Sequence, residues 1–244
     1  MKGIDVSHHN GMIDWDALAK SERIDFVIIR AGYGRLTKQK DKLFEKNYTG
    51  AKNAGLHVGA YWYSYAQNPA EALLEAKTCL EIIKNKKFDM PIYFDIEESS
   101  QVKLRKAVCS AMVKAFCGEL EKAGYFVGVY SFDSFFKTNL DDDIRTRYAT
   151  WIARTPKNDD GKTVIKPSYN CGIHQYSFKG KIPGINGDVD LNTCDTNYPD
   201  VIRRKGLNGY GSYKVIAIKA NLSDSDATEL KKKCKALGMT VKIE

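Results

Sequence analysis

Hydrophobic and polar positions along the chain predict strands that alternate with helices. Short apolar runs rich in β-branched and aromatic residues predict eight strands, at residues 3–6, 25–30, 57–65, 91–96, 125–131, 148–153, 172–177 and 188–191. From the second strand to the fifth, the strand centres advance by roughly 33 residues, the length of a strand plus a helix rather than of a hairpin. Two helices are clearest. One begins at Asn68-Pro69, and the other ends at Gly124.

Repeated strand–helix units with strands that are apolar on both faces predict a parallel sheet covered by helices, and eight such strands predict a barrel. Residues 154–170 break this pattern, because two prolines and an Asn-Asp-Asp-Gly cluster stand where a helix is expected. We therefore expect loops and hairpins to join the last strands. The predicted fold class is therefore α/β, an irregular and incomplete (β/α)8-like barrel with a small C-terminal βαβ appendage.

The domain boundaries follow from a change of composition near residue 205. Residues 1–204 form the predicted barrel, residues 205–212 a Gly-rich linker, and residues 213–244 the appendage, with strands at 213–219 and 239–243 around a helix at 224–237. A segment this short rarely buries a core of its own. We therefore expect the appendage to dock on the barrel or, preferably, to pair with a second copy in a homodimer.

The composition excludes several classes of protein. Apolar residues make up 43% of the 244 and charged residues 28%, which excludes a disordered or collagen-like chain. No apolar run approaches the roughly 20 residues of a membrane span, and no export signal is visible, so no membrane partner is expected. The setting predicted is therefore cytoplasmic accumulation followed by release, or a secreted form whose signal has been trimmed.

The positive charge lies mostly at the C-terminus. Residues 201–244 hold ten Lys or Arg against four Asp or Glu, out of 38 and 30 in the whole chain. Such a tail could bind a polyanion, for example an anionic wall polymer, although a solvated Lys-rich helix face would show the same composition.

The six cysteines do not indicate a metal site, because they include no C-x-x-C pair and no histidine at zinc-finger spacing. Cys109 and Cys117 would lie about 12 Å apart along a helix, too far for a disulfide. We expect mostly buried, reduced thiols, with no metal and no cofactor.

Acidic residues fall where barrel enzymes keep their chemistry, near the strand ends that form the barrel mouth. They are Asp5 on the first strand, Asp95 and Glu97 on the fourth, and Asp190 on the last. Residues i and i+2 of a strand point to the same face, about 6–7 Å apart at Cα. Because crowded carboxyls cannot all ionise freely, one of them can serve as an acid while its neighbour stays an anion.

Aromatic residues surround these acids and suit stacking on sugar rings. Successive side chains of a strand point to opposite faces, a period of two residues. Tyr61 and Tyr63 therefore lie on one face and Trp62 on the other, so only one set can face the mouth. Tyr33 and Tyr130 complete the predicted substrate-binding set. Among the histidines, we expect His8 and His9 to have polar loop roles, and His57 and His174 to be ordinary strand residues.

Together these segments resemble the glycoside hydrolase family 25 lysozymes, N-acetylmuramidases that cut bacterial peptidoglycan. The matching segments are GIDVS (3–7), FVIIRA (26–31), GAYWY (59–63), PIYFDIE (91–97), WIA (151–153), QYS (175–177) and GDVDLN (187–192). The resemblance covers roughly residues 1–198, implies an irregular β/α barrel, and makes peptidoglycan the expected partner.

The resemblance also implies roles for individual residues. Glu97 would be the general acid/base and Asp95 its essential partner, with Asp5 and Asp190 completing the acidic floor. The residues implied to line the sugar groove are Tyr61, Trp151 and Gln175. Two positions depart from the pattern or compete within it: His174 stands where Trp is expected, and Asp188 competes with Asp190, which fits the Val-Asp-x-Asn pattern better.

Several alternatives remain open at this point. Asp95 could stabilise an intermediate formed by the substrate's own acetamide, or an aspartate could act as a direct nucleophile. A divalent-metal nuclease also needs clustered carboxylates, and a non-catalytic barrel could bind carbohydrate through the aromatics. The intact Asp95 and Glu97 argue against the non-catalytic alternative, and no nucleic-acid partner is expected.

Overall fold

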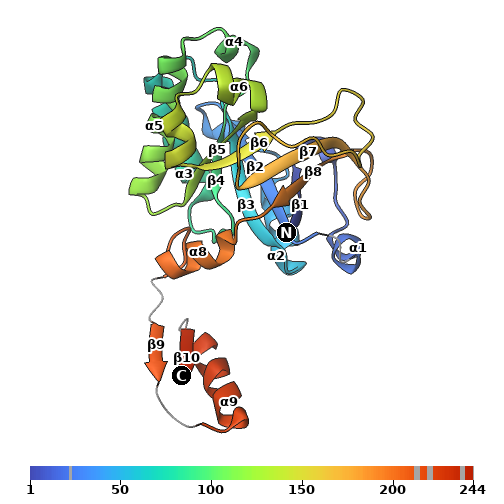
Figure 1. The fold of residues 1–244 in the computed structure, drawn as a ribbon, viewed down its shortest axis with the longest axis vertical. Coiled ribbons are helices and arrows are strands. Elements are labelled where there is room, and N and C mark those ends of the chain that lie inside the picture. The colour runs from blue at the N-terminus through green and yellow to red at the C-terminus, as the bar shows by residue number, and fades with distance from the viewer. Residues whose placement is uncertain (22–23, 212–214, 219–221, 237–239, 244) are drawn as a thin grey trace.

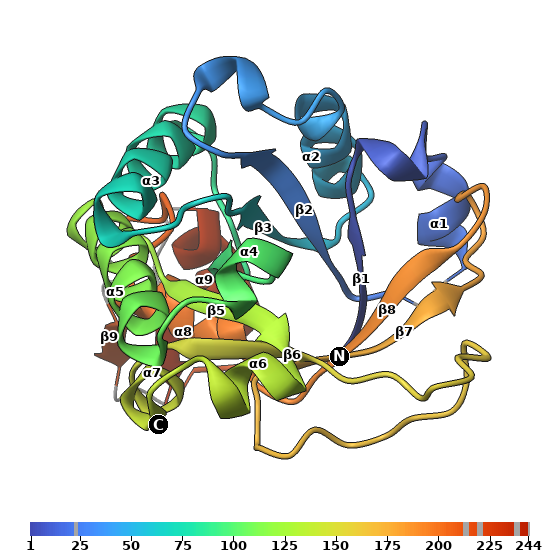
Figure 2. The same ribbon diagram turned by 90° about the horizontal axis from the view of Figure 1, so that it is seen from above.

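Eight strands pair side by side into a closed barrel (Figures 1 and 2). The structure is a computed structural model that describes residues 1–21, 24–211, 215–218, 222–236 and 240–243. The barrel strands are β1 (Lys2–Val6), β2 (Phe26–Tyr33), β3 (His57–Tyr63), β4 (Ile92–Asp95), β5 (Val127–Phe132), β6 (Ala149–Ala153), β7 (Ile173–Gly180) and β8 (Val189–Cys194). Each coincides with a predicted strand to within a few residues.

Helices cover the outside of the first part of the barrel. They are α1 (Trp15–Lys20), α2 (Phe44–Asn53), α3 (Pro69–Ile83), α4 (Ser99–Val102), α5 (Lys106–Lys122), α6 (Asp133–Thr138), α7 (Asp142–Arg147) and α8 (Tyr198–Lys205), with short 3-10 turns η1 (His8–Asn10) and η2 (Thr37–Gln39). The α3 helix begins as its sequence predicts, because the Asn68 side chain accepts the Glu71 N–H and Pro69 occupies the first turn.

The irregularity predicted for the second half is confirmed. Neighbouring strands from β1 to β7 run parallel, whereas β8 runs antiparallel to both β7 and β1. Residues 154–170 contain no helix. The barrel is thus incomplete in its helices rather than in its strands, because β8 still closes the ring.

Alternate residues of each strand point into the barrel, as period two requires. At the end where the parallel strands begin, the interior is filled by large side chains, including Phe26, Ile28 and Tyr93, each fully buried. Small residues on neighbouring strands make room for them: a Cβ on Gly128 would lie 2.4 Å from the Tyr93 ring. These side chains close this end of the barrel, so a pocket inside the barrel can open only at the other end.

The closed end also holds part of the predicted linker. Helix α8 ends at Gly206, whose left-handed φ of 65° provides the cap. Asn208 is fully buried, accepts the Phe126 N–H at 2.7 Å and donates to the Met90 carbonyl at 2.9 Å. Residues 206–210 therefore belong to the barrel, and the predicted boundary at residue 204 lies too early.

Tyr210 ties the same segment to a buried carboxylate. Its hydroxyl donates to Asp89 Oδ1 at 2.6 Å, and Arg203 and Lys52 also reach Asp89. Burial alone would raise the pKa of Asp89, but the hydrogen bonds from Lys52, Tyr210 and Arg203 hold it at about 2. The segment after α8 is thus fixed by ionic as well as neutral contacts.

Replacing Asn208 by glycine is expected to lower the free energy of unfolding by about 2–4 kcal/mol, because a buried N–H and a buried carbonyl lose their partners. Glycine is chosen because φ at Asn208 is 56°, where alanine would add strain. Urea denaturation measures the change. The matched control is Asn85→Gly, since Asn85 has φ 64° but is exposed; an equal loss in both variants would contradict the anchoring role.

The appendage contains the elements predicted for it. Strands β9 (Val215–Ile218) and β10 (Thr240–Ile243) pair in parallel, and α9 (Asp224–Ala236) lies between them in the chain. Figure 1 shows these elements separate from the barrel. The outer ends of the predicted elements, 213–214, 219 and 237–239, lie outside the described residues, as do 212, 220–221 and 244. Its pairing with a second copy and its binding to wall polymers stay predictions.

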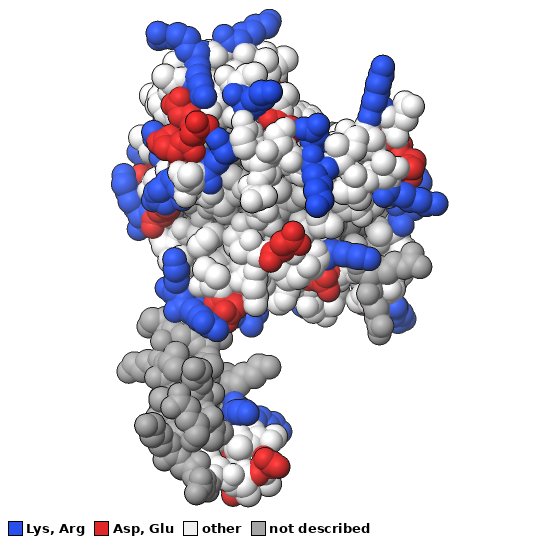
Figure 3. Space-filling view, viewed as in Figure 1, with Lys and Arg blue, Asp and Glu red and all other residues white. Residues whose placement is uncertain are grey.

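The charge of the C-terminal region divides between two structures. Three of its ten basic residues, Arg203, Arg204 and Lys205, belong to α8 on the barrel, which leaves residues 213–244 with seven Lys against four acids. Elsewhere on the barrel face seen in Figure 3, Lys and Arg are interspersed with Asp and Glu. The appendage itself is therefore only moderately basic. None of the helices described is long and apolar enough to cross a membrane.

Candidate active site

A pocket of about 370 Å³ opens at the barrel end that is seen from above in Figure 2. All eight strands or the loops beside them contribute to its lining, which consists of Asp5, Ser7, His9, Asn10, Arg30, Tyr61, Tyr63, Asp95, Glu97, Tyr130, Trp151, Gln175, Asp188 and Asp190. Asp190 enters from the start of its strand, because β8 runs antiparallel. All four predicted carboxyls thus meet in one pocket.

Asp5 and Asp190 form the first acidic pair and are direct neighbours across β1 and β8. Asp5 Oδ2 accepts hydrogen bonds from Gln175 Nε2 and Asn192 Nδ2, both at 2.8 Å. Burial raises the pKa of Asp5 to about 6, and burial together with the charge of Asp5 raises the pKa of Asp190 to about 9. Two buried carboxyls this close cannot both ionise freely, so the pair favours holding a proton.

Asp95 and Glu97 form the second pair, at the end of β4. Burial raises the pKa of Asp95 well above its usual value, and the negative charge of Glu97 adds to the effect. Burial, Asp5 and Glu98 raise the pKa of Glu97 to about 7. Among the residues that the structure describes, Asp95 Oδ1 and Glu97 Oε2 have no hydrogen-bond partner. This pair can hold an acid beside an anion near neutral pH.

Aromatic side chains form the wall beside these acids. Tyr130 donates to Gln175 Oε1 at 2.7 Å, and Trp151 Nε1 donates to Asn192 Oδ1 at 2.8 Å. Tyr61 lies edge-on to Trp151, with 6.0 Å between the ring centres. Trp62 points away from the barrel interior and donates to the Gly34 carbonyl at 2.9 Å, as period two predicts. Because Trp151 is only 1% exposed, it supports the floor rather than offering an open face.

Two predicted or competing residues lie apart from the acids. Tyr33 is not among the lining residues; its ring packs edge-on against Tyr65, with centres 6.0 Å apart. Asp188 lies at the rim, where Lys179 and Lys181 pair with its carboxylate at 2.9 and 2.7 Å. The geometry thus favours Asp190 over Asp188 as a member of the acidic floor.

Sequence reasoning did not select Arg30, although its position carries a signal. It follows Phe26 and Ile28 at period two on β2, so it points into the barrel above them. Its Nε lies 2.9 Å from Asp41 Oδ2, and its positive charge opposes the rise in the pKa of Asp95. Arg30 therefore limits the electrostatic cost of the acid cluster.

The loop after β1 supplies Ser7, His9 and Asn10, which sequence reasoning also did not select as site residues. Ser7 caps η1 by accepting the His9 N–H at 3.2 Å, and Asn10 Oδ1 accepts the Ser7 N–H at 2.9 Å. His8 is held by Asp41 at 2.9 Å, the polar loop role expected of it. Within the described residues, no group of three or more His, Cys, Asp or Glu could hold a metal ion.

The cysteines agree with the expectation of unpaired thiols. All six are free, and five of them are buried. Burial raises the pKa of the Cys171 and Cys194 thiols to about 11, so neither is an activated nucleophile. His174, on β7, hydrogen-bonds the carbonyl of Arg154 after β6 at 3.0 Å and is not among the residues that line the pocket.

Comparison with known proteins agrees with this geometry. The chain is 33% identical over 195 residues to a protein named autolytic lysozyme from Clostridium acetobutylicum. The alignment covers 78% of this chain and 55% of that protein. Among solved structures, the catalytic domain of endolysin ply40 from bacteriophage P40 of Listeria monocytogenes is similar with a TM-score of 0.69 and 27% identity, over 84% of this chain and 97% of that one.

The modular autolysin LytC from Streptococcus pneumoniae is also similar, with a TM-score of 0.66 and 30% identity, over 78% of this chain and 46% of that one. This chain thus spans about half the length of the clostridial and pneumococcal relatives. Residues 4–185 match the family described as glycosyl hydrolases family 25, and the chain therefore belongs to that family.

Proposed function

We propose that this protein is a peptidoglycan hydrolase that cleaves the β-1,4 bond between N-acetylmuramic acid and N-acetylglucosamine. The observation that carries the proposal is the buried acid pair at the end of β4, in which the pKa of Glu97 is raised to about 7 beside Asp95. The names of the relatives, autolytic lysozyme and endolysin, support the same substrate, and LytC has been solved with a synthetic peptidoglycan ligand.

In the proposed reaction the protonated Glu97 acts first as a general acid. It donates its proton to the glycosidic oxygen as the bond to the anomeric carbon breaks, and the acetamide oxygen of the muramic acid forms a bond to that carbon. Asp95 would stabilise the positive charge of the resulting oxazolinium ring as an anion. Burial and the charge of Glu97 raise the pKa of Asp95 in the free protein, so this role requires the positive charge of the ring to favour ionisation of Asp95. Glu97, now ionised, takes a proton from the water that opens the ring.

The remaining residues position these groups. Gln175 links Tyr130 to Asp5 through two hydrogen bonds, of 2.7 and 2.8 Å, so the floor and the aromatic wall form one network. Tyr61 and Tyr63 offer the partly exposed aromatic surface for a sugar ring. Direct attack by Asp95 remains the second mechanism, distinguished by a covalent glycosyl-enzyme that mass spectrometry would detect.

Mass spectrometry of fragments from purified peptidoglycan tests the function. Reducing-end muramic acid is expected, whereas reducing-end glucosamine would show cleavage of the other glycan bond. A parallel assay after EDTA treatment should keep full activity. Loss of activity that magnesium restores, or digestion of DNA under the same conditions, would favour the metal-nuclease alternative.

The pH dependence offers a separate prediction. Because Glu97 must be protonated to donate, kcat/KM should fall as the pH rises through about 7, the pKa of Glu97. The charge of Glu98 helps to raise that pKa. Glu98→Gln should therefore move the alkaline limb of the profile of kcat/KM against pH to lower pH, by roughly half a pH unit. Gln keeps an acceptor for the Tyr63 hydroxyl, which lies at 2.8 Å. A limb that stays in place, or moves up, would contradict Glu97 as the acid.

A further inference from the structure

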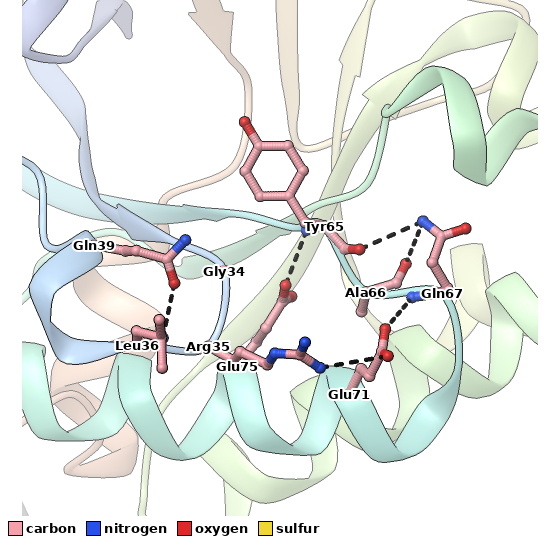
Figure 4. Close-up of a pocket in the computed structure, with 9 residues that line it drawn as sticks. All are labelled: Gly34, Arg35, Leu36, Gln39, Tyr65, Ala66, Gln67, Glu71 and Glu75. Carbon is pink, nitrogen blue, oxygen red and sulfur yellow. Dashed lines mark hydrogen bonds and ion pairs between the residues drawn. The ribbon is translucent and has the colours of Figure 1, made fainter.

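A second pocket, of about 440 Å³, lies between the first half of α3 and the loops that follow β2 and β3 (Figure 4). Its polar lining includes Arg35, Gln67, Glu71 and Glu75, none of which belongs to the acid pocket. Figure 4 shows the two glutamates rising from α3 beneath Tyr65 and Gln67. The mechanism above assigns no role to any of these four side chains.

Glu75 is the central feature of this pocket. It is 2% exposed, and only one of its two carboxylate oxygens has a hydrogen-bond partner among the described residues. Its Oε1 accepts the Tyr65 N–H at 2.9 Å, whereas Oε2 has no hydrogen-bond partner among the described residues. Burial raises the pKa of Glu75 to about 7, although interactions with the Ser64 hydroxyl and the backbone of Tyr65 and Ala66 oppose the rise. A buried carboxylate oxygen without a donor is costly, so a ligand that brings a donor and a positive charge would be bound favourably.

Arg35, the base among the lining residues, pairs with Glu71 rather than with Glu75. Arg35 Nη1 lies 3.4 Å from Glu71 Oε1, and the Arg35 side chain is 56% exposed. Glu71 Oε2 already accepts the Gln67 N–H at 2.8 Å. Two acids face one base in this pocket, so its charge favours a cationic ligand over an anionic one.

The second pocket adjoins the first through a pair of tyrosines. Tyr63 lines the acid pocket and Tyr65 the second, and their rings lie edge to face with centres 5.2 Å apart. Tyr65 is 49% exposed, so this boundary is open to solvent. A polymer whose backbone occupies the acid pocket can therefore place a side branch over the tyrosines and into the second pocket.

We propose that this pocket binds a primary ammonium group on the stem peptide of peptidoglycan while the glycan lies in the acid pocket. The proposal rests on the function proposed above, because muramic acid carries its peptide as a branch from the glycan. Stem peptides include a diamino residue whose second amino group is a free ammonium wherever the strand is not cross-linked. Glu75 would accept from this ammonium, and Glu71 would add negative charge at the entrance.

The test compares hydrolysis of three soluble forms of uncross-linked glycan: with free stem-peptide amines, with those amines acetylated, and with the peptides removed. Acetylation should raise KM of the wild-type protein about tenfold and leave kcat unchanged, as expected for the loss of one charge-assisted hydrogen bond used in binding. Glu75→Gln and Glu71→Gln should bring KM for the free-amine form close to that for the acetylated form. Neither variant should change KM for peptide-free glycan.

Glu81→Gln is the matched control, because it removes an exposed carboxylate from the same helix outside the pocket. The proposal is overturned if acetylation has no effect on the wild-type protein, or if its effect persists in both pocket variants. An effect of amidating the stem-peptide carboxylates in place of acetylation would point to Arg35 and an anionic ligand, and would equally overturn it.

Failure of the proposed function can be recognised separately. If none of the three glycans is cleaved, the function is wrong, and calorimetry then tests the pocket alone with a free stem peptide and its acetylated form. Binding of the free amine that is weakened about tenfold by acetylation and by Glu75→Gln supports the pocket. Equal binding of the two peptides overturns it.

Discussion

Glu97→Gln is expected to lower kcat for peptidoglycan hydrolysis by at least ~10²–10⁴, the contribution of a positioned general acid. The amide keeps the size of the side chain but has no proton to give to the leaving oxygen. Turbidity of a cell-wall suspension and release of reducing ends both measure the loss. A folded variant that clears walls at close to the wild-type rate would show that Glu97 is not the acid.

The stability of this variant separates a catalytic loss from a folding defect. Because burial raises the pKa of Glu97 to about 7, the folded protein binds this proton more tightly than the unfolded chain does. The carboxyl therefore costs stability as the pH rises from its unfolded pKa through about 7. Glu97→Gln should be at least as stable as the wild type at neutral and alkaline pH, and Glu98→Gln serves as the matched change one residue away.

Asp95→Asn is expected to lower activity by a comparable factor, also ~10²–10⁴, for a different reason. The asparagine cannot carry the negative charge that is proposed to stabilise an oxazolinium intermediate. Its effect should appear in kcat more than in KM, because the charge develops after binding. Steady-state kinetics on a soluble glycan, which allows KM to be measured, provides the test.

Asp188→Asn is the control for that variant. Asp188 lies at the rim with two lysines, so its loss should change activity only slightly. An equal loss in both variants would mean that general negative charge around the pocket matters rather than the position of Asp95. A mild effect of Asp95→Asn would argue against its role at the intermediate.

The strands could be predicted because each combines a short apolar run with turn residues at both ends. Trp62 and Tyr63 show how far the argument extends: the alternation of side chains along a strand places them on opposite faces, and the structure puts Tyr63 in the pocket. The direction of β8 could not be predicted in this way, since a strand has the same periodicity whether it runs parallel or antiparallel.

The same limits apply to the site. The four carboxyls could be predicted because each falls in or just after a predicted strand, near the end that forms the mouth of a barrel. Tyr33 shows where the argument fails, because its ring turns toward Tyr65 and away from the acids. The inward direction of Arg30 could be predicted from the alternation of side chains along its strand. The burial of Glu75 could not, because an acid in an amphipathic helix normally faces solvent.

The end of the barrel was misjudged for a physical reason. Four glycines and serines between residues 205 and 212 are typical of a linker, yet Asn208 is fully buried there. Tight turns and flexible linkers use the same residues, and only the contacts of Asn208 and Tyr210 distinguish them. A truncation intended to remove the appendage alone should therefore end after Gly211 and not at Arg204.

The closure of the barrel by β8 bears on when an active protein first exists during synthesis. Asn192 and Asp5 hydrogen-bond each other across 187 residues of chain, and β1 has no second neighbour until β8 arrives. Contacts so distant in sequence form late in folding, because a long loop must close first. A nascent chain that ends before residue 190 lacks Asp190, so the acid cluster proposed for hydrolysis is complete only when nearly the whole barrel has been synthesised.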